Sequence, residues 1–115
     1  CAYQDIDGKD PKGIHIIGKK NEEIIAYSRI INLNNDFCSI GRVLVKKESR
    51  KKGVGIKLMK KSIEEATKEF IKRKIKISAQ EYLKKFYTNL GFKHTGKSYL
   101  EDGIPHIEMI SNLKR

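Results

Sequence analysis

Residues 43–59, "VLVKKESRKKGVGIKLM", join a β-branched segment to a basic turn and then to the start of a helical pattern. Gly53 and Gly55 lack Cβ atoms, so the backbone of the turn can adopt left-handed dihedrals and approach a ligand closely. From Val54 onward, apolar residues recur at steps of three and four as far as Phe70. This spacing predicts an amphipathic helix that follows a strand through a positively charged turn.

The basic turn is suited to holding an anion. A helix N-terminus presents unpaired backbone N–H groups and a partial positive charge, which both attract phosphate. Arg50, Lys51 and Lys52 add charge at the same place, which predicts a polyphosphate ligand. Two glycines that only ease a strand-to-helix turn are the simpler alternative. The P-loop spacing is missing, and Leu58 stands where the dinucleotide fingerprint G-x-G-x-x-G needs its third glycine.

The charge of the chain is concentrated in its middle. The 115 residues carry a net charge of +11, and residues 42–76 hold fourteen Lys or Arg against four Glu. Such a segment predicts nucleic acid, an acidic membrane surface or a phosphorylated small molecule as partner, or else a solvated lysine-rich surface. No apolar run long enough to span a membrane is present, and two cysteines are too few for a four-cysteine zinc site. We expect a cytoplasmic protein without a metal.

The rest of the chain predicts one mixed α/β (α+β) sheet in the order βββαβαββ. Strands are expected within 14–33 (two strands joined at Gly18–Glu23), 37–47, 74–78, 92–100 and 104–113, whereas residues 1–13 are expected to form a loop. Ser78 and Glu81 have capping-box spacing, which predicts that the second helix begins there. The apolar side of this helix is expected to carry Tyr82, Leu83, Phe86, Tyr87 and Leu90, and Gly91 ends it.

Two motifs then match a known family. Residues 43–59 resemble the acetyl-coenzyme-A signature of the GCN5-related N-acetyltransferases (GNAT), V-x-x-x-x-[RQ]-x-x-G-x-[GA], with Val45, Arg50, Gly53 and Gly55 at its fixed positions. Residues 80–92, "QEYLKKFYTNLGF", are similar to the family element N-x-x-x-x-x-x-Y-x-x-x-G-F, with Gln80 in the asparagine position and Tyr87 as the tyrosine. The resemblance implies a GNAT-like acyl-CoA N-acyltransferase fold formed by residues 1–115 as a single domain.

The resemblance also implies acetyl-CoA as cosubstrate. Strand backbone at 43–45 would bind the pantetheine arm and the turn at 51–56 the pyrophosphate. The residues expected to bind acetyl-CoA are Val43, Leu44, Val45, Arg50, Lys51, Lys52, Gly53, Val54, Gly55, Ile56, Gln80 and Tyr87. Further segments at 1–10, 77–92 and 99–109 resemble the ElaA-like subfamily. Its members carry an additional N-terminal strand and helical segment, so this chain is expected to be N-terminally truncated.

The implied reaction is direct transfer of acetyl to a primary amine of a small molecule, peptide or protein. Tyr87 is the expected general acid, and Glu101 or His106 the expected base, since the strand at 74–78 carries no carboxylate. The alternatives are that Tyr87 belongs only to an apolar helix stripe, and that "EDG" at 101–103 is a plain turn with His106 facing solvent. Two readings are open for Asp5, Asp7, Asp10, Glu101 and Asp102: an acidic rim that attracts a cationic amine, or the ordinary polarity of loop residues.

Two other functions remain open at this point. A CoA-binding protein of the same fold without catalysis would keep both motifs. A nucleic-acid-binding module would explain the basic segment, but no zinc-finger spacing or RNP-like motif is present, and lysines recur all around the helix after Gly55. Exposed sheet edges also make a homodimer a plausible assembly.

Overall fold

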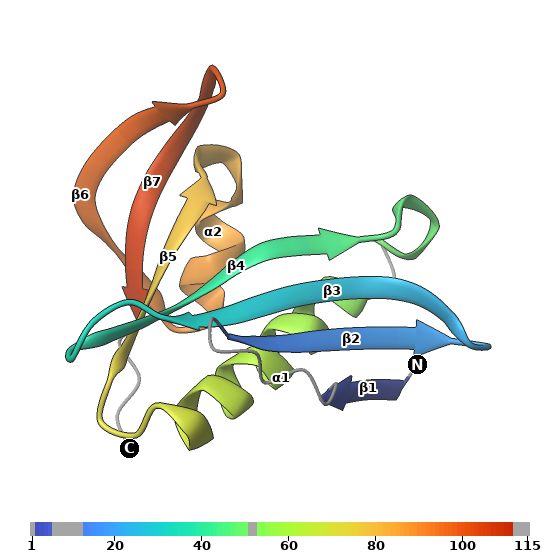
Figure 1. The fold of residues 1–115 in the computed structure, drawn as a ribbon. Coiled ribbons are helices and arrows are strands. Elements are labelled where there is room, and N and C mark those ends of the chain that lie inside the picture. Colours follow the sequence, from blue (N-terminus) through green and yellow to red (C-terminus); the bar gives the residue numbers. More distant parts are fainter. Residues whose placement is uncertain (1, 6–12, 51–52, 112–115) are drawn as a thin grey trace.

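The computed structural model describes residues 2–5, 13–50 and 53–111. These residues form one seven-stranded sheet in the order β1-β2-β3-β4-β5-β7-β6 (Figure 1). The strands are β1 (Ala2–Asp5), β2 (Ile14–Lys20), β3 (Glu23–Asn32), β4 (Phe37–Val45), β5 (Lys74–Gln80), β6 (Phe92–Glu101) and β7 (Ile104–Ser111). The helices are α1 (Val54–Glu69) and α2 (Lys84–Asn89), with 3₁₀ turns η1 (Lys47–Ser49) and η2 (Glu81–Leu83).

The mixed sheet predicted from the sequence is confirmed, with one strand added at its start. Residues 2–5, predicted as loop, form β1 and pair antiparallel with β2 from Ala2↔Lys19 to Asp5↔Ile16. The polar sequence of this segment gave no strand signal. It pairs nonetheless because the edge of β2 offers backbone N–H and C=O groups that need partners. The observed order is therefore ββββαβαββ.

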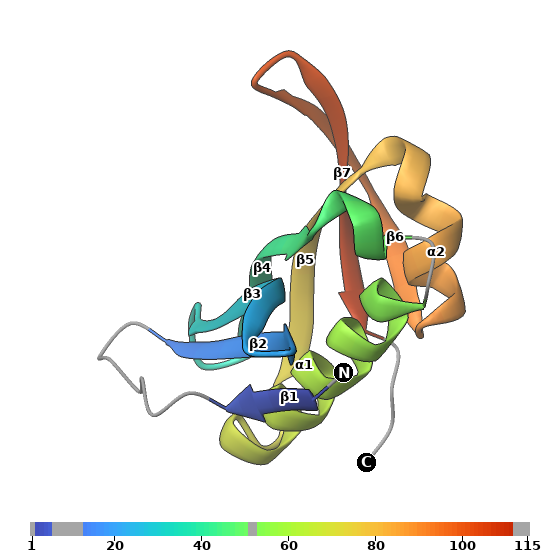
Figure 2. The same cartoon turned by 90° about the vertical axis from the view of Figure 1, so that its right-hand side faces the viewer.

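The crossover through α1 sets the geometry of the centre of the sheet. β4 and β5 are parallel neighbours, as predicted, and pair at Phe37↔Lys74, Cys38↔Ile75 and Ser39↔Lys76. Past these residues no pairing between the two strands is found in the described part of the chain, and Figure 1 shows them diverging from this common end. α2 packs against β6 and β5 and therefore lies on the β5 side of the gap between β4 and β5 (Figure 2).

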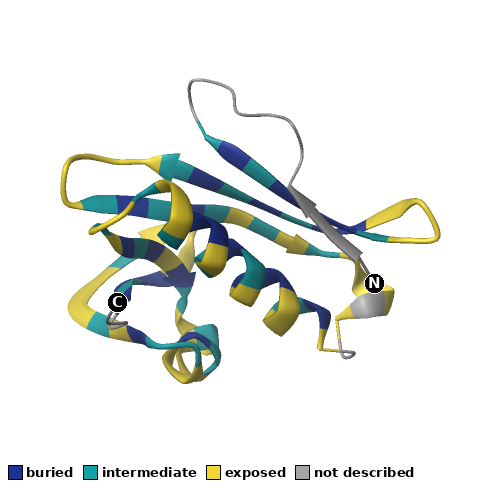
Figure 3. Ribbon diagram, turned by 90° about the horizontal axis from the view of Figure 1, so that it is seen from below, coloured by how far each residue is buried: buried dark blue, intermediate teal, exposed yellow. Residues whose placement is uncertain are grey.

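The core lies between the two helices and the sheet, and strands β2 to β7 all contribute buried residues to it. Leu58, Met59 and Ala66 of the predicted helix stripe are fully enclosed, and the opposite side of α1 is exposed (Figure 3). One charged residue of the helix, Glu65, is buried as well. Full burial of a Leu or Met side chain stabilises the fold by about 1.5–3 kcal/mol. One polar pair is enclosed here: the Oγ atoms of Ser28 and Ser62 are 2.6 Å apart, and Ser62 donates to the carbonyl of Leu58 at 2.7 Å.

The second helix begins later than predicted. Ser78 lies within β5, which continues to Gln80 because Gln80 still pairs with His106 on β7. A 3₁₀ turn follows, and neither η2 nor α2 has a side-chain cap, so the predicted capping box is not formed. Tyr82, predicted on the apolar side, falls in η2 and is 78% exposed. Gly91 ends the helix with φ 100°, as predicted.

The closing pair of strands is also confirmed. β6 and β7 form a long hairpin whose two-residue turn holds Asp102 (φ 53°) and Gly103 (φ 76°). The hairpin rises beyond the rest of the sheet in Figure 1. In the described part of the chain, no helix combines the length and apolar character needed to cross a membrane.

Candidate active site

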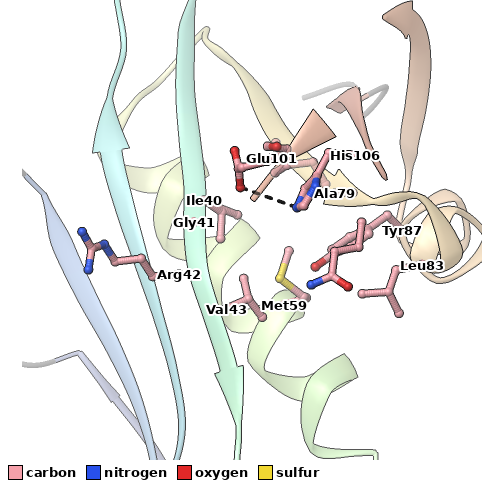
Figure 4. Close-up of a pocket in the computed structure, with 13 residues that line it drawn as sticks. Ile40, Gly41, Arg42, Val43, Met59, Ala79, Leu83, Tyr87, Glu101 and His106 are labelled. Atoms are coloured by element: carbon pink, nitrogen blue, oxygen red, sulfur yellow. Dashed lines mark ion pairs between the residues drawn. The ribbon is translucent and has the colours of Figure 1, made fainter. Parts of the chain in front are cut away.

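A pocket of about 240 Å³ occupies the gap where β4 and β5 diverge (Figure 4). Its walls come from both strands, from α1 and from the hairpin. It lies between two strands of one sheet, and Met59 of α1 and Tyr87 of α2 are among the residues that line it. The lining residues are Ile40, Gly41, Arg42, Val43, Met59, Ile77, Ser78, Ala79, Gln80, Leu83, Tyr87, Glu101 and His106.

The β4 wall of the pocket is bulged. The register with β3 shifts between Tyr27↔Leu44 and Arg29↔Gly41, so that two residues of β4 oppose one of β3. Arg42 sits in the bulge with φ 51°, a backbone conformation that non-glycine residues rarely adopt. Bulges re-aim side chains and interrupt pairing. This one accompanies the separation of β4 from β5.

Tyr87 enters the pocket from α2. It is 7% exposed and makes edge-to-face contacts with Phe86 and Phe92, with ring centroids 5.0 and 6.1 Å away. Burial raises the pKa of Tyr87 above its ordinary value, with a further contribution from Tyr82. The phenol is therefore neutral at physiological pH and can donate a proton. Its ring belongs to the apolar packing and also lines the pocket, so the two readings of Tyr87 from sequence are compatible.

Glu101 and His106 meet at the opposite side of the pocket. His106 Nε2 lies 3.5 Å from Glu101 Oε2, and the His106 ring stacks on Tyr99 at a centroid distance of 6.1 Å. Its Nδ1 lies 2.8 Å from the carbonyl oxygen of Ile104, which can only accept, so Nδ1 carries the hydrogen. In the neutral ring the lone pair is consequently on Nε2, beside the carboxylate. The alternative of a solvent-facing His106 is wrong, since the residue is 7% exposed.

The N-terminus of α1 lies next to this pocket. Gly53 is the helix N-cap, with φ 75°, and the first described helical hydrogen bond runs from Lys57 N to Gly53 O at 3.1 Å. A Cβ on Gly55 would lie 3.8 Å from Phe86 and 4.0 Å from Val45. The start of the helix therefore packs between the end of β4 and α2. The first turn contains no acidic residue, so the positive potential of the helix end is not neutralised there.

The comparison with protein families decides the identity of the fold. A family model described as an acetyltransferase (GNAT) domain matches residues 2–113. The chain belongs to the GNAT acetyltransferase family. Protein ElaA of Escherichia coli K12 is 43% identical over 113 residues, covering 95% of this chain and 74% of ElaA. The crystal structure of Escherichia coli ElaA superimposes with a TM-score of 0.82 over 96% of this chain and 77% of that one.

Two further solved structures share the fold. An acyl-CoA N-acyltransferase from Pseudomonas aeruginosa is 29% identical, with a TM-score of 0.79 over 86% of this chain and 68% of its own. A GNAT family acetyltransferase from Elizabethkingia anophelis with acetyl-CoA bound is 21% identical, with a TM-score of 0.74 over 90% of this chain and 78% of its own. The GNAT fold predicted from the two motifs is thus confirmed.

The GNAT signature residues occupy different parts of the site. Val43 lines the pocket, whereas Leu44 and Val45 line a separate shallow hollow beside β3. Arg50 folds back on the strand, and its Nε donates to the carbonyl of Val45 at 3.0 Å, which closes the turn. Lys51 and Lys52 lie outside the described residues.

The predicted acidic rim is only partly formed. Asp5 lies on β1 and Glu101 on β6, which are the two opposite edges of the sheet. Asp7 and Asp10 lie outside the described residues. Of the described residues predicted for the rim, only Glu101 and Asp102 lie close together, at the tip of the β6–β7 hairpin. A rim that joins the N-terminal aspartates to the hairpin is therefore wrong for Asp5.

Several residues of this GNAT pocket were not predicted from the sequence to belong to a site. Ser78 faces it from β5, and its Oγ forms a hydrogen bond with the hydroxyl of Tyr99 on β6. Gly41 and Arg42 form its bulged wall. A glycine inside a strand pattern is a known signal of a bulge, so Gly41 could have been noticed. The Ser78–Tyr99 pair joins distant strands and has no local signal.

Proposed function

We propose that the chain is an N-acetyltransferase that moves the acetyl group of acetyl-CoA directly to a primary amine of a small molecule, peptide or protein. The observation that carries this proposal is the pocket between the diverging strands. A neutral phenol, Tyr87, stands on one side of it, and the Glu101–His106 pair stands on the other. An acyl donor and an amine can therefore meet between an acid and a base.

Acetyl-CoA would bind as cosubstrate along β4 and α1. The left-handed Gly53 and the helix N-terminus favour the pyrophosphate, and the basic side chains around the turn add attraction. The Gln80 amide lines the pocket, where it can form hydrogen bonds with the pantetheine arm. The acetyl-CoA held by the GNAT relative from Elizabethkingia anophelis supports this choice of donor. The proposed contacts are those of Val43, Leu44, Val45, Arg50, Lys51, Lys52, Gly53, Val54, Gly55, Ile56, Gln80 and Tyr87.

His106 is the proposed general base. Its Nε2 lies 3.5 Å from the Glu101 carboxylate, so an alkylammonium group bound beside both atoms can donate hydrogen bonds to each of them. His106 then removes one proton from the ammonium group before attack, and Glu101 stabilises the imidazolium that forms. The hydrogen bond to Ile104 and the stacking on Tyr99 hold the ring in this orientation.

Tyr87 is the proposed general acid. The amine nitrogen attacks the thioester carbonyl carbon, the C–S bond breaks, and the thiolate of CoA takes the phenolic proton. The second proton lost by the attacking nitrogen passes through solvent to the tyrosinate and restores the phenol. A thiol has a pKa of about 8.5 and a phenol one of about 10, so this transfer is uphill and requires direct hydrogen-bond contact. Most of the rate enhancement comes from holding the two reactants in attack geometry.

The test is release of CoA thiol from acetyl-CoA in the presence of a panel of primary amines. We expect amine-dependent release by the wild type, reduced at neutral pH by His106→Gln and shifted in its pH profile by Glu101→Gln. Binding of acetyl-CoA without amine-dependent thiol release would show a CoA-binding protein without catalysis. Identical pH–rate profiles for the wild type and both variants would remove the pair from the mechanism.

A further inference from the structure

The open face of the sheet carries an arginine with an unsatisfied donor. Ser28 and Ile30 on β3 are buried toward α1, so Arg29 between them points to the opposite face. Its Nε is buried and has no hydrogen-bond partner in the described part of the protein. Guanidinium cannot lose its proton in proteins, and a buried donor without a partner is costly. Such a group calls for an explanation, and a missing anionic ligand supplies one.

Arg29 does not itself line the pocket, but its partner on the neighbouring strand does. It pairs in register with Gly41, which lines the pocket, and side-chain positions on directly opposed strand residues are about 5 Å apart. A Cβ placed on Gly41 would meet nothing within 4 Å. There is consequently open space on the β4 wall directly beside the Arg29 position.

Arg42 brings a second cation to the same place. It follows Gly41 in the bulge, is exposed and lines the pocket. Figure 4 shows its side chain extending from β4 toward β3, away from Glu101 and His106. No ion pair to either arginine is found among the described residues. Two unpaired guanidinium groups that flank one glycine repel each other unless an anion lies between them.

We infer that the acceptor is an amino carboxylate, with its carboxylate held by Arg29 and Arg42 and its amine held between Glu101 and His106. This inference rests on the proposed function and names the substrate class of the same pocket. The planar fork of an arginine matches the two oxygens of a carboxylate. A polyamine would place a second positive charge beside the two arginines and is therefore disfavoured, in contrast to the acidic rim expected from the sequence.

The positions of the two ends also set the length of the acceptor. Arg29 is on β3 and His106 on β7, with β4 and β5 between them. Paired neighbouring strands are about 4.8 Å apart, and the gap between the diverging β4 and β5 is wider, so β3 and β7 are more than roughly 14 Å apart at the pocket. An amine attached directly to the carbon beside the carboxylate is too short to reach both ends. The acceptor is a compound whose amine lies several bonds from its carboxylate, such as an ω-amino acid, or lysine accepting the acetyl group on its side-chain amine.

The experiment compares acceptors that differ only in the carboxylate. CoA release is measured with 6-aminohexanoate against hexylamine and with lysine against cadaverine, for the wild type, Arg29→Gln and Arg29→Lys. Arg73→Gln, which removes the same charge at the start of β5, is the matched control. We expect Arg29→Gln to raise the KM of the amino carboxylates at least tenfold, to leave hexylamine unchanged, and Arg29→Lys to restore part of the loss.

Separate outcomes distinguish the two proposals. Hexylamine and cadaverine could prove as efficient acceptors as 6-aminohexanoate and lysine, with the KM of all four unaltered by Arg29→Gln. In that case the carboxylate subsite is wrong while acetyl transfer stands. A preference for an aminoalkyl phosphate over 6-aminohexanoate would also overturn it. Calorimetric titration of 6-aminohexanoate into the CoA-saturated protein tests the subsite without turnover. Binding lost in Arg29→Gln but kept in Arg73→Gln supports the subsite, and equal binding, or none to the wild type, refutes it.

Discussion

Replacement of Tyr87 by phenylalanine isolates one oxygen atom in the pocket. The ring would keep its edge-to-face contacts with Phe86 and Phe92. No protein hydrogen bond of the Tyr87 hydroxyl is found in the part of the chain that the structure describes, so folding loses little. We expect the free energy of unfolding to change by no more than about 0.5 kcal/mol at neutral pH. The affinity for acetyl-CoA should also stay within about twofold, because a lost neutral hydrogen bond to the ligand is a small term.

Turnover should respond very differently from stability. A positioned general acid contributes roughly 10²–10⁴-fold to the rate, or about 2.7–5.4 kcal/mol of activation free energy. Tyr87→Phe should therefore lower kcat by at least a hundredfold in the thiol-release assay. Tyr82→Phe, at the exposed tyrosine of η2, is the control and should leave kcat unchanged. Equal kcat for the wild type and Tyr87→Phe would refute the assignment.

The raised pKa of Tyr87 gives the same variant a second readout. Burial favours the neutral phenol in the folded protein, so the unfolded chain releases this proton at lower pH than the folded one. The corresponding stability is fully present below about pH 10, the ordinary tyrosine pKa, and is lost as the pH rises through the folded pKa. The free energy of unfolding, measured with denaturant between pH 9 and 11, should fall less steeply with pH in Tyr87→Phe than in the wild type. Parallel slopes would contradict the burial argument.

Two further predictions concern the fold around the site. Ser62→Ala should cost about 1–3 kcal/mol, because it leaves the buried Ser28 hydroxyl without a partner, whereas Ser28→Ala should cost about 1 kcal/mol since Ser62 keeps its bond to Leu58. Equal losses in urea unfolding would contradict this order. Gly53→Ala should cost about 1–2 kcal/mol at its left-handed φ, and Gly55→Ala, which fits at ordinary contact distance, should gain about 0.5–1 kcal/mol. Thermal unfolding measures both, and a gain at Gly53 would refute the strain argument.

Local patterns predicted most of the fold. The three- and four-residue steps from Val54 located α1, and Gly91 located the end of α2. The start of that helix was missed, since the capping-box spacing at Ser78 competes with strand pairing that depends on the distant His106. The strand at Ala2–Asp5 was missed for the same reason, because edge pairing with β2 is a tertiary interaction.

In the candidate site too, residues within local motifs could be predicted from sequence, whereas contacts between distant segments could not. Residues inside the two motifs could be placed from sequence, because strand, turn and helix fix their neighbours. Glu101 and His106 were named from sequence as alternative bases near a hairpin turn, but their contact with each other, and the bond to Ile104 and stacking on Tyr99 that hold His106, depend on tertiary structure. Gly41 was a local signal of the bulge at Arg42, but the unsatisfied Nε of Arg29 depends on the register between strands, which has no local signal.

The most direct test of the central claim is calorimetric titration with acetyl-CoA, with a single-stranded oligonucleotide as the second ligand. Gly53→Glu places a negative charge at the proposed phosphate cradle, and Gly103→Glu makes the same change at a glycine of nearly equal φ, 76° against 75°, on the hairpin. We expect saturable one-to-one binding of acetyl-CoA, weakened at least tenfold by Gly53→Glu and little changed by Gly103→Glu. Absence of acetyl-CoA binding, or salt-sensitive binding of the oligonucleotide alone, would contradict the acetyltransferase account.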